Sequence, residues 1–318
     1  MPPHWTAATE NGFTSTRAVV GMILSGSTSQ ALALALGAIL DEPVIPLDYD
    51  RFPDGELLVQ VDRDATLPEG VVLDGTSFTI DDRALVVAST PTSAAHIELL
   101  QLQDLAHEAH AESITTIIPY LGYARQDRAH EPGQPASARA ICRAIGASTD
   151  RIITVDPHEA VVCDYFDVPC VAVSAIGTLA SALSIESDAP LFLAPDEGAR
   201  SLATSLRDAY GEGTVDHFIK RRTGGDTVEI TPSETDVADR EVVIVDDIIA
   251  TGSTIATATS LLTSRGVNTV RVACVHALLV GGAHTRLRRA GVDELVATDT
   301  IERAVTAASA APAITESI

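Results

Sequence analysis

The stretch "VVIVDDIIATGST", residues 242–254, decides the fold of this 318-residue chain. It opens with a run of apolar residues, which is typical of a strand that is buried on both faces of a sheet. Asp246 and Asp247 mark the end of that strand, and "ATGST" leads into an Ala- and Leu-rich stretch of helical period that starts near Ile255. A strand, a short turn and a helix in direct succession indicate a parallel sheet covered by helices.

The turn in this stretch has the chemistry of a phosphate site. Gly252 lets the backbone approach a phosphate closely, and the N–H groups at the start of the following helix supply donors and positive potential. Further donors come from the hydroxyl groups of Thr251, Ser253 and Thr254. The two adjacent carboxylates would repel a phosphate and are better suited to accept hydrogen bonds from a sugar joined to it. A P-loop would need Gly-Lys before Ser or Thr, whereas the single lysine of the chain, Lys220, follows Ile219.

The rest of the chain repeats the alternation of strand and helix. Strands are expected at residues 84–90, 115–122, 151–159, 169–175, 191–198 and 269–279, and helices at residues 96–112, 137–147, 198–211 and 254–266. The pattern occurs twice, which predicts a tail at residues 1–18, domains at 19–167 and 168–298, and a C-terminal segment at 299–318 that is either a final helix or a frayed end. The predicted fold class is α/β, with a mainly parallel sheet flanked by helices in each domain.

The charge of the chain limits its partners. Asp and Glu total 44 whereas Lys and Arg total 21, which gives a formal net charge of −23. A field of this sign repels nucleic acid and anionic membranes, so neither is expected as a partner. The acidic, lysine-poor composition is typical of proteins that stay soluble in very high salt, and it predicts a halophilic source.

The N-terminal and cysteine patterns predict a cytoplasmic protein. No basic stretch leads into an apolar core, so no signal peptide is expected. The uncharged residues 18–40 are interrupted by "SGSTSQ", which favours a strand, a turn and a helix over a membrane span. Without C-x-x-C spacing, the cysteines are expected to be small buried residues of a reducing compartment: Cys142, Cys163, Cys170 and Cys274. Surface positions on one helix are expected for His96, His107 and His110.

Five shorter motifs occur in order along the chain: "RFPDGE" (51–56), "IPYLGYARQDR" (118–128), "VDPHE" (155–159), "APDEG" (194–198) and "KRR" (220–222). Residues 242–254 resemble the 5-phosphoribosyl 1-diphosphate motif that type I phosphoribosyltransferases share with ribose-phosphate diphosphokinases. With the five motifs, the chain resembles the ribose-phosphate diphosphokinases, their archaeal branch above all, over residues 20–300. The resemblance implies two tandem type I phosphoribosyltransferase-like domains, the first on the ATP side and the second on the ribose 5-phosphate side. It implies transfer of the diphosphoryl group of ATP to the 1-hydroxyl of ribose 5-phosphate, giving 5-phosphoribosyl 1-diphosphate and AMP for nucleotide biosynthesis.

The same resemblance implies the site residues. A homo-oligomer is expected, because ATP would be contacted across a subunit interface by Phe52, Asp54 and Glu56. The phosphates and base of ATP would be held by Arg125, Gln126, Asp127 and His158, with Arg128 nearby. Ribose 5-phosphate would be bound by Asp246, Asp247, Ala250, Thr251, Gly252, Ser253 and Thr254. The expected cofactor is Mg²⁺, held by His158 and Asp196.

The resemblance implies catalytic roles for Lys220 and Arg222, which lie in "KRRTGG" at residues 220–225. Negative charge that develops on transferring phosphoryl groups is stabilised by preorganised cations. A compact ammonium is not replaced by a guanidinium without a change of geometry. This requirement would explain why a chain that is otherwise free of lysine keeps this one.

Two other functions stay open at this point. A phosphoribosyltransferase with an enlarged N-terminal domain would share residues 242–254, but it would not need "RFPDGE" or "GYARQDR" and would not consume ATP. A catalytically silent paralogue that regulates an active synthetase would be expected to lack Lys220, Arg222 or His158, and all three are present. The usual P-D-x-G-G of the family reads "PDEGA" here, with Ala199 in place of the last glycine, and Ala250 stands where many members have Asp or Ser.

Overall fold

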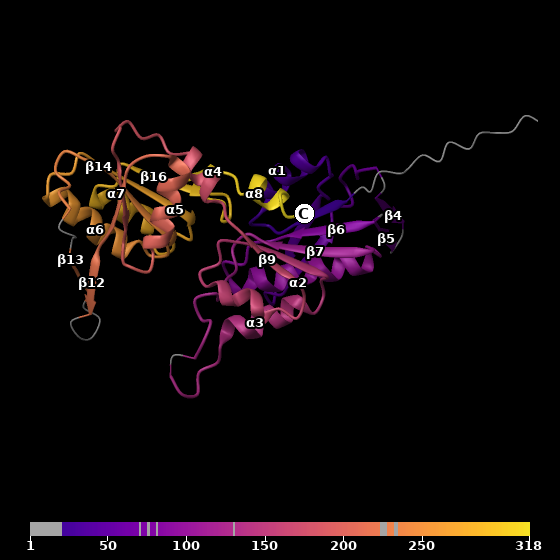
Figure 1. The fold of residues 1–318 in the computed structure, drawn as a ribbon. Helices are drawn as coiled ribbons and strands as arrows, with labels where there is room; N and C mark the ends of the chain where they lie inside the picture. The colour runs from indigo at the N-terminus through magenta and orange to yellow at the C-terminus, as the bar shows by residue number, and fades with distance from the viewer. Residues whose placement is uncertain are drawn as a thin grey trace, which may run out of the picture.

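The structure is a computed structural model that describes residues 21–69, 71–74, 77–80, 82–129, 131–222, 228–231 and 235–318. The chain forms two parallel sheets, each flanked by helices (Figure 1). We call residues 21–173 the first half and residues 174–318 the second half, since one parallel sheet lies in each. This architecture confirms the predicted fold class. The predicted tail at residues 1–18 lies outside the described residues.

The first half is built on a five-stranded parallel sheet. The strand order is β1 (Met22–Ser25), β6 (Arg83–Val87), β7 (Ser113–Ile118), β8 (Arg151–Val155) and β9 (Cys170–Val173). Its helices are α1 (Gln30–Leu40), α2 (Ser93–Glu108), α3 (Ser137–Gly146) and the short 3-10 helix η1 (Ala160–Tyr165). Two antiparallel hairpins complete it: β2 (Leu47–Arg51) with β3 (Leu57–Val61), and β4 (Val72–Asp74) with β5 (Ser77–Thr79).

The second half is built on a six-stranded parallel sheet. The strand order is β11 (Thr214–His217), β10 (Leu191–Ala194), β14 (Glu241–Ile248), β15 (Thr269–His276), β16 (Glu294–Thr298) and β17 (Thr306–Ala308). Its helices are α4 (Ile176–Ser181), α5 (Arg200–Tyr210), α6 (Ser253–Ser264), α7 (Ala283–Ala290) and α8 (Ala311–Thr315). A separate antiparallel hairpin, β12 (Ile219–Arg222) with β13 (Val228–Thr231), extends away from this sheet (Figure 1).

The strand predicted from the apolar run is central in the second sheet. β14 lies between β10 and β15, and the side chains of residues 242–245 are fully buried. The strand ends with Asp246 and Asp247 followed by Ile248, and α6 begins at Ser253. The structure therefore confirms the strand, turn and helix that this stretch predicted.

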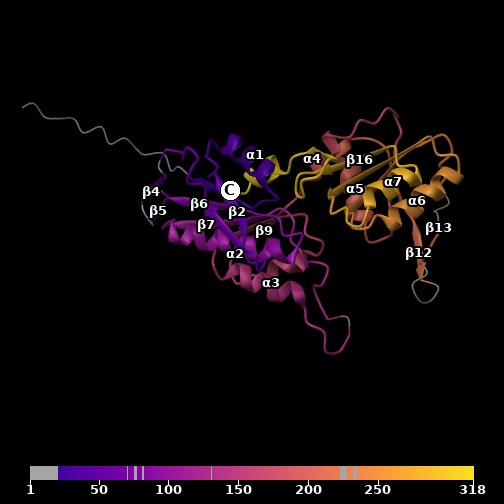
Figure 2. The ribbon, with the colours of Figure 1, turned by 180° about the vertical axis from the view of Figure 1, so that it is seen from behind.

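The two halves are joined by a shared core. One cluster of buried side chains contains Val87 and Ile153 of the first half together with Val243 and Val275 of the second. The C-terminal helix α8 packs against α1 of the first half, and the two helices lie side by side in both views (Figure 1 and Figure 2). The carboxylate of Glu302 accepts hydrogen bonds from the N–H groups of residues 31 and 32, so a residue of the second half caps α1.

The sheets divide the chain differently from the predicted boundaries. β9 pairs with β8, so the first sheet continues past residue 167. The second sheet continues to β17, which lies within the predicted C-terminal segment at residues 299–318. That segment ends in α8, whose Ile314 is fully buried. The segment therefore belongs to the fold of both halves: β17 extends the second sheet, and α8 packs on α1 of the first half.

Two expectations about single residues were wrong. His96 was expected at the surface, but its side chain is 5% exposed because it faces the core side of α2, beside Tyr123. Burial lowers the pKa of His96 to about 4, so the ring is neutral. Cys142 and Cys274 are buried as expected, whereas Cys163 and Cys170 are only half-buried. Among the helices of the described ranges, none has both the length and the apolar character needed to cross a membrane.

Candidate active site

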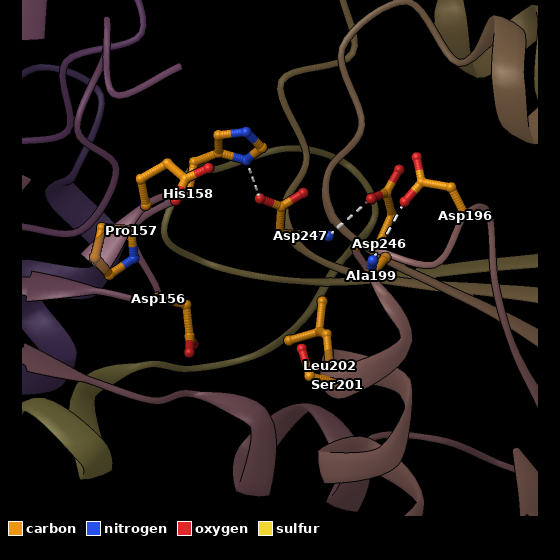
Figure 3. Close-up of a pocket in the computed structure, with 11 residues that line it drawn as sticks. Asp156, Pro157, His158, Asp196, Ala199, Ser201, Leu202, Asp246 and Asp247 are labelled. Atoms are coloured by element: carbon orange, nitrogen blue, oxygen red, sulfur yellow. Dashed lines mark hydrogen bonds and ion pairs between the residues drawn. The ribbon is translucent and has the colours of Figure 1, made fainter. Parts of the chain in front are cut away.

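A cavity of about 520 Å³ opens where the carboxyl ends of β8, β10 and β14 meet. The first half contributes residues 156–159, and the second half contributes Asp196, Asp246 and Asp247 with the start of α5 (Figure 3). Ligands of parallel α/β sheets bind outside the carboxyl ends of the strands. The cavity therefore lies where the topology of both sheets predicts a site.

The two halves are in direct contact inside this cavity. Nδ1 of His158 lies 2.5 Å from Oδ2 of Asp247, although the two residues are 89 positions apart (Figure 3). The hydrogen bond to Asp247 is the main cause of a raised pKa of His158. Burial works to raise the pKa of Asp247, but the hydrogen bond and the charge of His158 outweigh it and lower the pKa. Both shifts favour an imidazolium paired with a carboxylate.

The pKa of the neighbouring carboxyl group, Asp246, shifts in the opposite direction. Burial, followed by the charge of Asp247, raises the pKa of Asp246 well above 3.8. Asp196 adds to this effect from the end of β10, where its Oδ1 accepts a hydrogen bond of 3.2 Å from the N–H of Ala199. Two adjacent carboxyl groups with pKa values pushed apart can serve as a donor and an acceptor to the same ligand.

The predicted phosphate loop lies directly after β14. Gly252 adopts a φ of +70°, and a Cβ at this position would lie 3.1 to 3.4 Å from side-chain atoms of Leu287 in α7. Glycine is therefore required here both by conformation and by packing. The hydroxyl groups of Thr251 and Ser253 lie 3.2 Å apart at the start of α6, which places donors beside the helix N-terminus.

A second layer of contacts holds the phosphate loop in place. The N–H groups of Leu279 and Val280 donate to the carbonyls of Ile249 and Ala250, at 2.9 and 3.0 Å. The guanidinium of Arg286 in α7 donates to the carbonyl of Thr251. No motif in the sequence indicated this role of Arg286. The available signal was a set of arginines at residues 286–289 in an otherwise acidic chain.

Arg125 and Gln126 line a second pocket, of about 250 Å³, next to the end of β7. The charge of Arg125 acts to lower the pKa of His158, so this pocket lies close to the main cavity. Asp127 is different: its side chain is buried and lines neither pocket, and its backbone carbonyl accepts a hydrogen bond from the Tyr165 hydroxyl. Arg128 is exposed and lies 4.0 Å from the Asp127 carboxylate.

Neither pocket is lined by Phe52, Asp54 or Glu56 of the same chain. They lie in the turn between β2 and β3, where Phe52 is 48% exposed. The turn is ordered by its own backbone, since the N–H of Phe52 donates to the carbonyl of Glu56 at 2.8 Å. An exposed aromatic ring on a well-formed turn is suited to contact another molecule.

Lys220 and Arg222 lie in β12, which follows β11 at the edge of the second sheet. The buried Phe218 anchors the start of the hairpin, because its N–H donates to the carbonyl of Ala194 at 3.0 Å. The hairpin thus begins beside the end of β10, two residues before Asp196. The side chains of both cations lie outside the described part of the structure.

His158 and Asp196, the expected metal ligands, both line the main cavity. Within the described ranges, no group of three or more His, Cys, Asp or Glu side chains is arranged to hold a metal ion. Mg²⁺ is usually bound by one or two carboxylates together with waters and substrate phosphates. The carboxylates of residues 196, 246 and 247 fit that chemistry, since they meet at one cavity and oxygen ligands are those that Mg²⁺ prefers.

Comparisons with known proteins cover almost the whole chain. The family model described as the N-terminal domain of ribose phosphate pyrophosphokinase matches residues 21–148, and the phosphoribosyl transferase domain matches residues 172–309. The chain is 52% identical to the ribose-phosphate pyrophosphokinase of Halobacterium salinarum, over 93% of this chain and all of that one. It is 40% identical to the enzyme of the same name from Methanopyrus kandleri, over 93% and 98% of the two chains. The crystal structure of phosphoribosylpyrophosphate synthetase from Mycobacterium smegmatis superposes with a TM-score of 0.75 at 27% identity, over 94% of this chain and 97% of that one.

Proposed function

The chain belongs to the ribose-phosphate pyrophosphokinase family, and we propose a role for each of its site residues in the reaction of that family. The enzyme transfers the diphosphoryl group of ATP to the 1-hydroxyl of ribose 5-phosphate, which gives 5-phosphoribosyl 1-diphosphate and AMP. The observation that carries the proposed roles is the cavity between the halves, which His158, Asp246 and Asp247 line. The phosphate loop follows Asp247 along the chain, and Arg125 lines the smaller pocket.

Ribose 5-phosphate is bound by the end of β14 and the start of α6. The N–H groups of residues 251–254 and the hydroxyls of Thr251, Ser253 and Thr254 hold the 5-phosphate, and Ala250 contributes only its backbone. Asp247 accepts a hydrogen bond from one ring hydroxyl. Asp246 is able to donate as well as accept, because its raised pKa favours the protonated form.

ATP is bound from the first half. The fork of Arg125 suits the phosphates, and Gln126 offers an amide to the base at the mouth of the smaller pocket. Asp127 supports this loop from behind, in keeping with its burial. Phe52, Asp54 and Glu56 complete the ATP site of a neighbouring subunit in a homo-oligomer, which their exposure and their position outside both pockets support.

Asp196, with phosphate oxygens of the substrates, would hold Mg²⁺, and His158 would join it through Nε2 once that nitrogen has lost its proton. When bound, the ion would supply positive charge against the phosphates. His158 is hydrogen-bonded to Asp247 in this structure and would exchange that partner when ATP binds.

In the chemical step, the 1-oxygen of the sugar bonds to the β-phosphorus of ATP and gives up its proton to solvent, while the bond from that phosphorus to the bridging oxygen breaks and AMP leaves with that oxygen. Lys220 and Arg222 stabilise the charge on the transferring oxygens from the β12–β13 hairpin. Both substrates are metabolites of the cytoplasm, so we place the enzyme there.

The test uses purified protein in molar KCl with MgCl₂, ATP and ribose 5-phosphate, and follows nucleotides and sugar phosphates by chromatography. We expect AMP and 5-phosphoribosyl 1-diphosphate in equal amounts, and loss of both in Lys220→Ala. The matched control is Arg143→Ala, on α3, which contributes to neither pocket. Release of diphosphate from added 5-phosphoribosyl 1-diphosphate, dependent on a base and without ATP turnover, would indicate a transferase instead. Folded protein without either activity would indicate a silent paralogue.

A further inference from the structure

His276 ends β15 directly beneath the active site, but it is not part of the cavity wall. Its side chain is buried, with 1% of the residue exposed. Each ring nitrogen has one partner: Nε2 lies 3.1 Å from the carbonyl oxygen of Asp156, and Nδ1 lies 2.8 Å from Oγ1 of Thr300. Asp156 belongs to the first half and Thr300 to the second, so the ring bridges the two halves.

The partners determine the tautomer of this ring. A carbonyl oxygen can only accept, so Nε2 must carry the hydrogen. Burial lowers the pKa of His276 to about 4, so the ring is neutral and Nδ1 is an acceptor. The hydroxyl of Thr300 can donate either to Nδ1 or to the carbonyl of Val275, which lies 2.9 Å away, and it must donate to Nδ1 for that nitrogen to be satisfied. The carbonyl of Val275 still receives a hydrogen bond of 2.8 Å from Thr298, so that carbonyl keeps a donor. The neutral ring is therefore fully satisfied in one orientation.

The carbonyl that His276 holds belongs to a strained residue. Asp156 has a φ of +35°, in a region that residues other than glycine rarely adopt. Its N–H donates to the carbonyl of Val173 at 2.9 Å, and its carboxylate accepts from the N–H of Ala175 at 2.8 Å. The bond from His276 adds the third constraint, on the peptide plane between Asp156 and Pro157.

That peptide plane begins the segment that carries His158. Proline fixes its own φ, so holding the plane before Pro157 removes one of the torsions that separate this plane from the imidazole. The imidazole of His158 reaches Asp247 across the cavity. A hydrogen bond made by the second half thus restrains the segment that carries a first-half residue of the site.

Further contacts connect Thr300 and the ring of His276 to the first half. The hydroxyl of Ser89 donates to the carbonyl of Thr300 and accepts from the N–H of Tyr120 at 3.2 Å. The ring of Tyr120 packs on His276, with 5.1 Å between the centroids. His276 and Thr300 are therefore held between two loops of the first half, at residues 89 and 156.

We propose that His276 is a positioning residue that transmits the relative placement of the two halves to His158 through the peptide of Asp156. The inference rests on the proposed role of His158 in binding ATP and metal. His276 touches no reacting atom, since it is not part of the cavity wall. Its effect on the reaction passes through residues 156–158.

Three variants test this role. His276→Leu removes both hydrogen bonds, and His276→Gln keeps an N–H that can donate to the Asp156 carbonyl. The matched control is Val272→Ala, a core substitution on the same strand within an apolar cluster. We expect kcat to fall about a hundredfold in His276→Leu, with most of it recovered in His276→Gln and little change in Val272→Ala. A fall in Val272→Ala equal to that in His276→Leu would overturn the proposal, because a general loss of stability would then explain both.

Two further measurements separate this role from the proposed reaction. In a His158→Ala background, His276→Leu should cause no additional loss of kcat, since the two residues act in series; full additivity would overturn the proposal. Hydrogen exchange without substrates should rise at residues 156–160 in His276→Leu and return toward wild type in His276→Gln. Unchanged exchange would overturn the positioning role whatever the activity. Absence of AMP formation by the wild type would instead overturn the proposed reaction and leave the exchange result intact.

Discussion

His158 and Asp247 come from different sheets, yet their side chains share a hydrogen bond of 2.5 Å at the centre of the active site. The bond joins the two halves, so it can form only when both are correctly placed. On the proposed roles, it also joins an ATP residue with a ribose 5-phosphate residue. Binding of one substrate would then change this contact and so affect binding of the other.

The first prediction concerns the pH dependence of this contact. The raised pKa of His158 means that its stabilisation is complete below pH 6.5 and is lost as the pH rises through the raised value. The lowered pKa of Asp247 means that its stabilisation is present above pH 3.8 and is lost as the pH falls through the lowered value. The Tm difference between wild type and Asp247→Asn should therefore be largest between about pH 4 and about pH 6.5.

Thermal unfolding at constant salt measures this difference, with the exposed Asp164→Asn as the control carboxylate. We expect the gap to narrow at alkaline pH. A gap of constant size from acid to alkaline pH would be inconsistent with an ionic pair.

The second prediction concerns Gly252. Alanine here must adopt a positive φ and press its Cβ against Leu287, so Gly252→Ala should cost about 1 to 2 kcal/mol of unfolding free energy and raise KM for ribose 5-phosphate. Gly177→Ala is the control, because a Cβ there meets no atom within 4 Å and alanine suits the helix α4. Equal stability of the two variants in urea would contradict the packing account.

The third prediction concerns Arg286. Arg286→Ala removes the donor that holds the carbonyl of Thr251, so the phosphate loop should bind more weakly. We expect KM for ribose 5-phosphate to rise about fivefold, equivalent to about 1 kcal/mol, with KM for ATP nearly unchanged. Arg289→Ala, exposed on the same helix, removes the same charge without that contact. An equal rise of KM in both variants would show that charge alone is responsible.

The fourth prediction concerns the subunit interface. If Phe52 serves the ATP site of a neighbour, Phe52→Ala should raise KM for ATP although the residue lines no pocket of its own chain. Inactive Lys220→Ala protein, dissociated and reassembled with Phe52→Ala protein, should then restore one normal site in each mixed pair. Affinity for ATP that stays at the level of Phe52→Ala after mixing would mean that Phe52 does not act across an interface.

The fifth prediction concerns salt. The formal charge of −23 repels itself in the folded state, so Tm should rise with monovalent salt as the repulsion is screened. NaCl and KCl at equal ionic strength should act alike if screening is the cause. A Tm that falls over the first additions of salt would rule out self-repulsion as the main electrostatic influence on stability.

Much of the site could be predicted from the sequence because its parts are local. The buried strand, the two aspartates and the glycine turn at residues 242–254 follow from periodicity and from the steric needs of a phosphate loop. His96 was misplaced because a histidine in a helix carries no sign of which face it occupies. The contacts of His276 with Asp156, and of Arg286 with Thr251, depend on how separate elements pack, which no local pattern encodes.

The packing of α8 on α1 has a consequence for how the protein is made. Ile314 and its neighbours complete a cluster that contains Leu32 and Leu36, and Glu302 supplies the cap of α1. Glu302 is synthesised 271 residues after the α1 N–H group that it caps. The nascent first half therefore keeps part of its apolar surface exposed until these residues have been made. We expect that the first half does not complete its folding alone, and that a chain that stops before α8 binds chaperones.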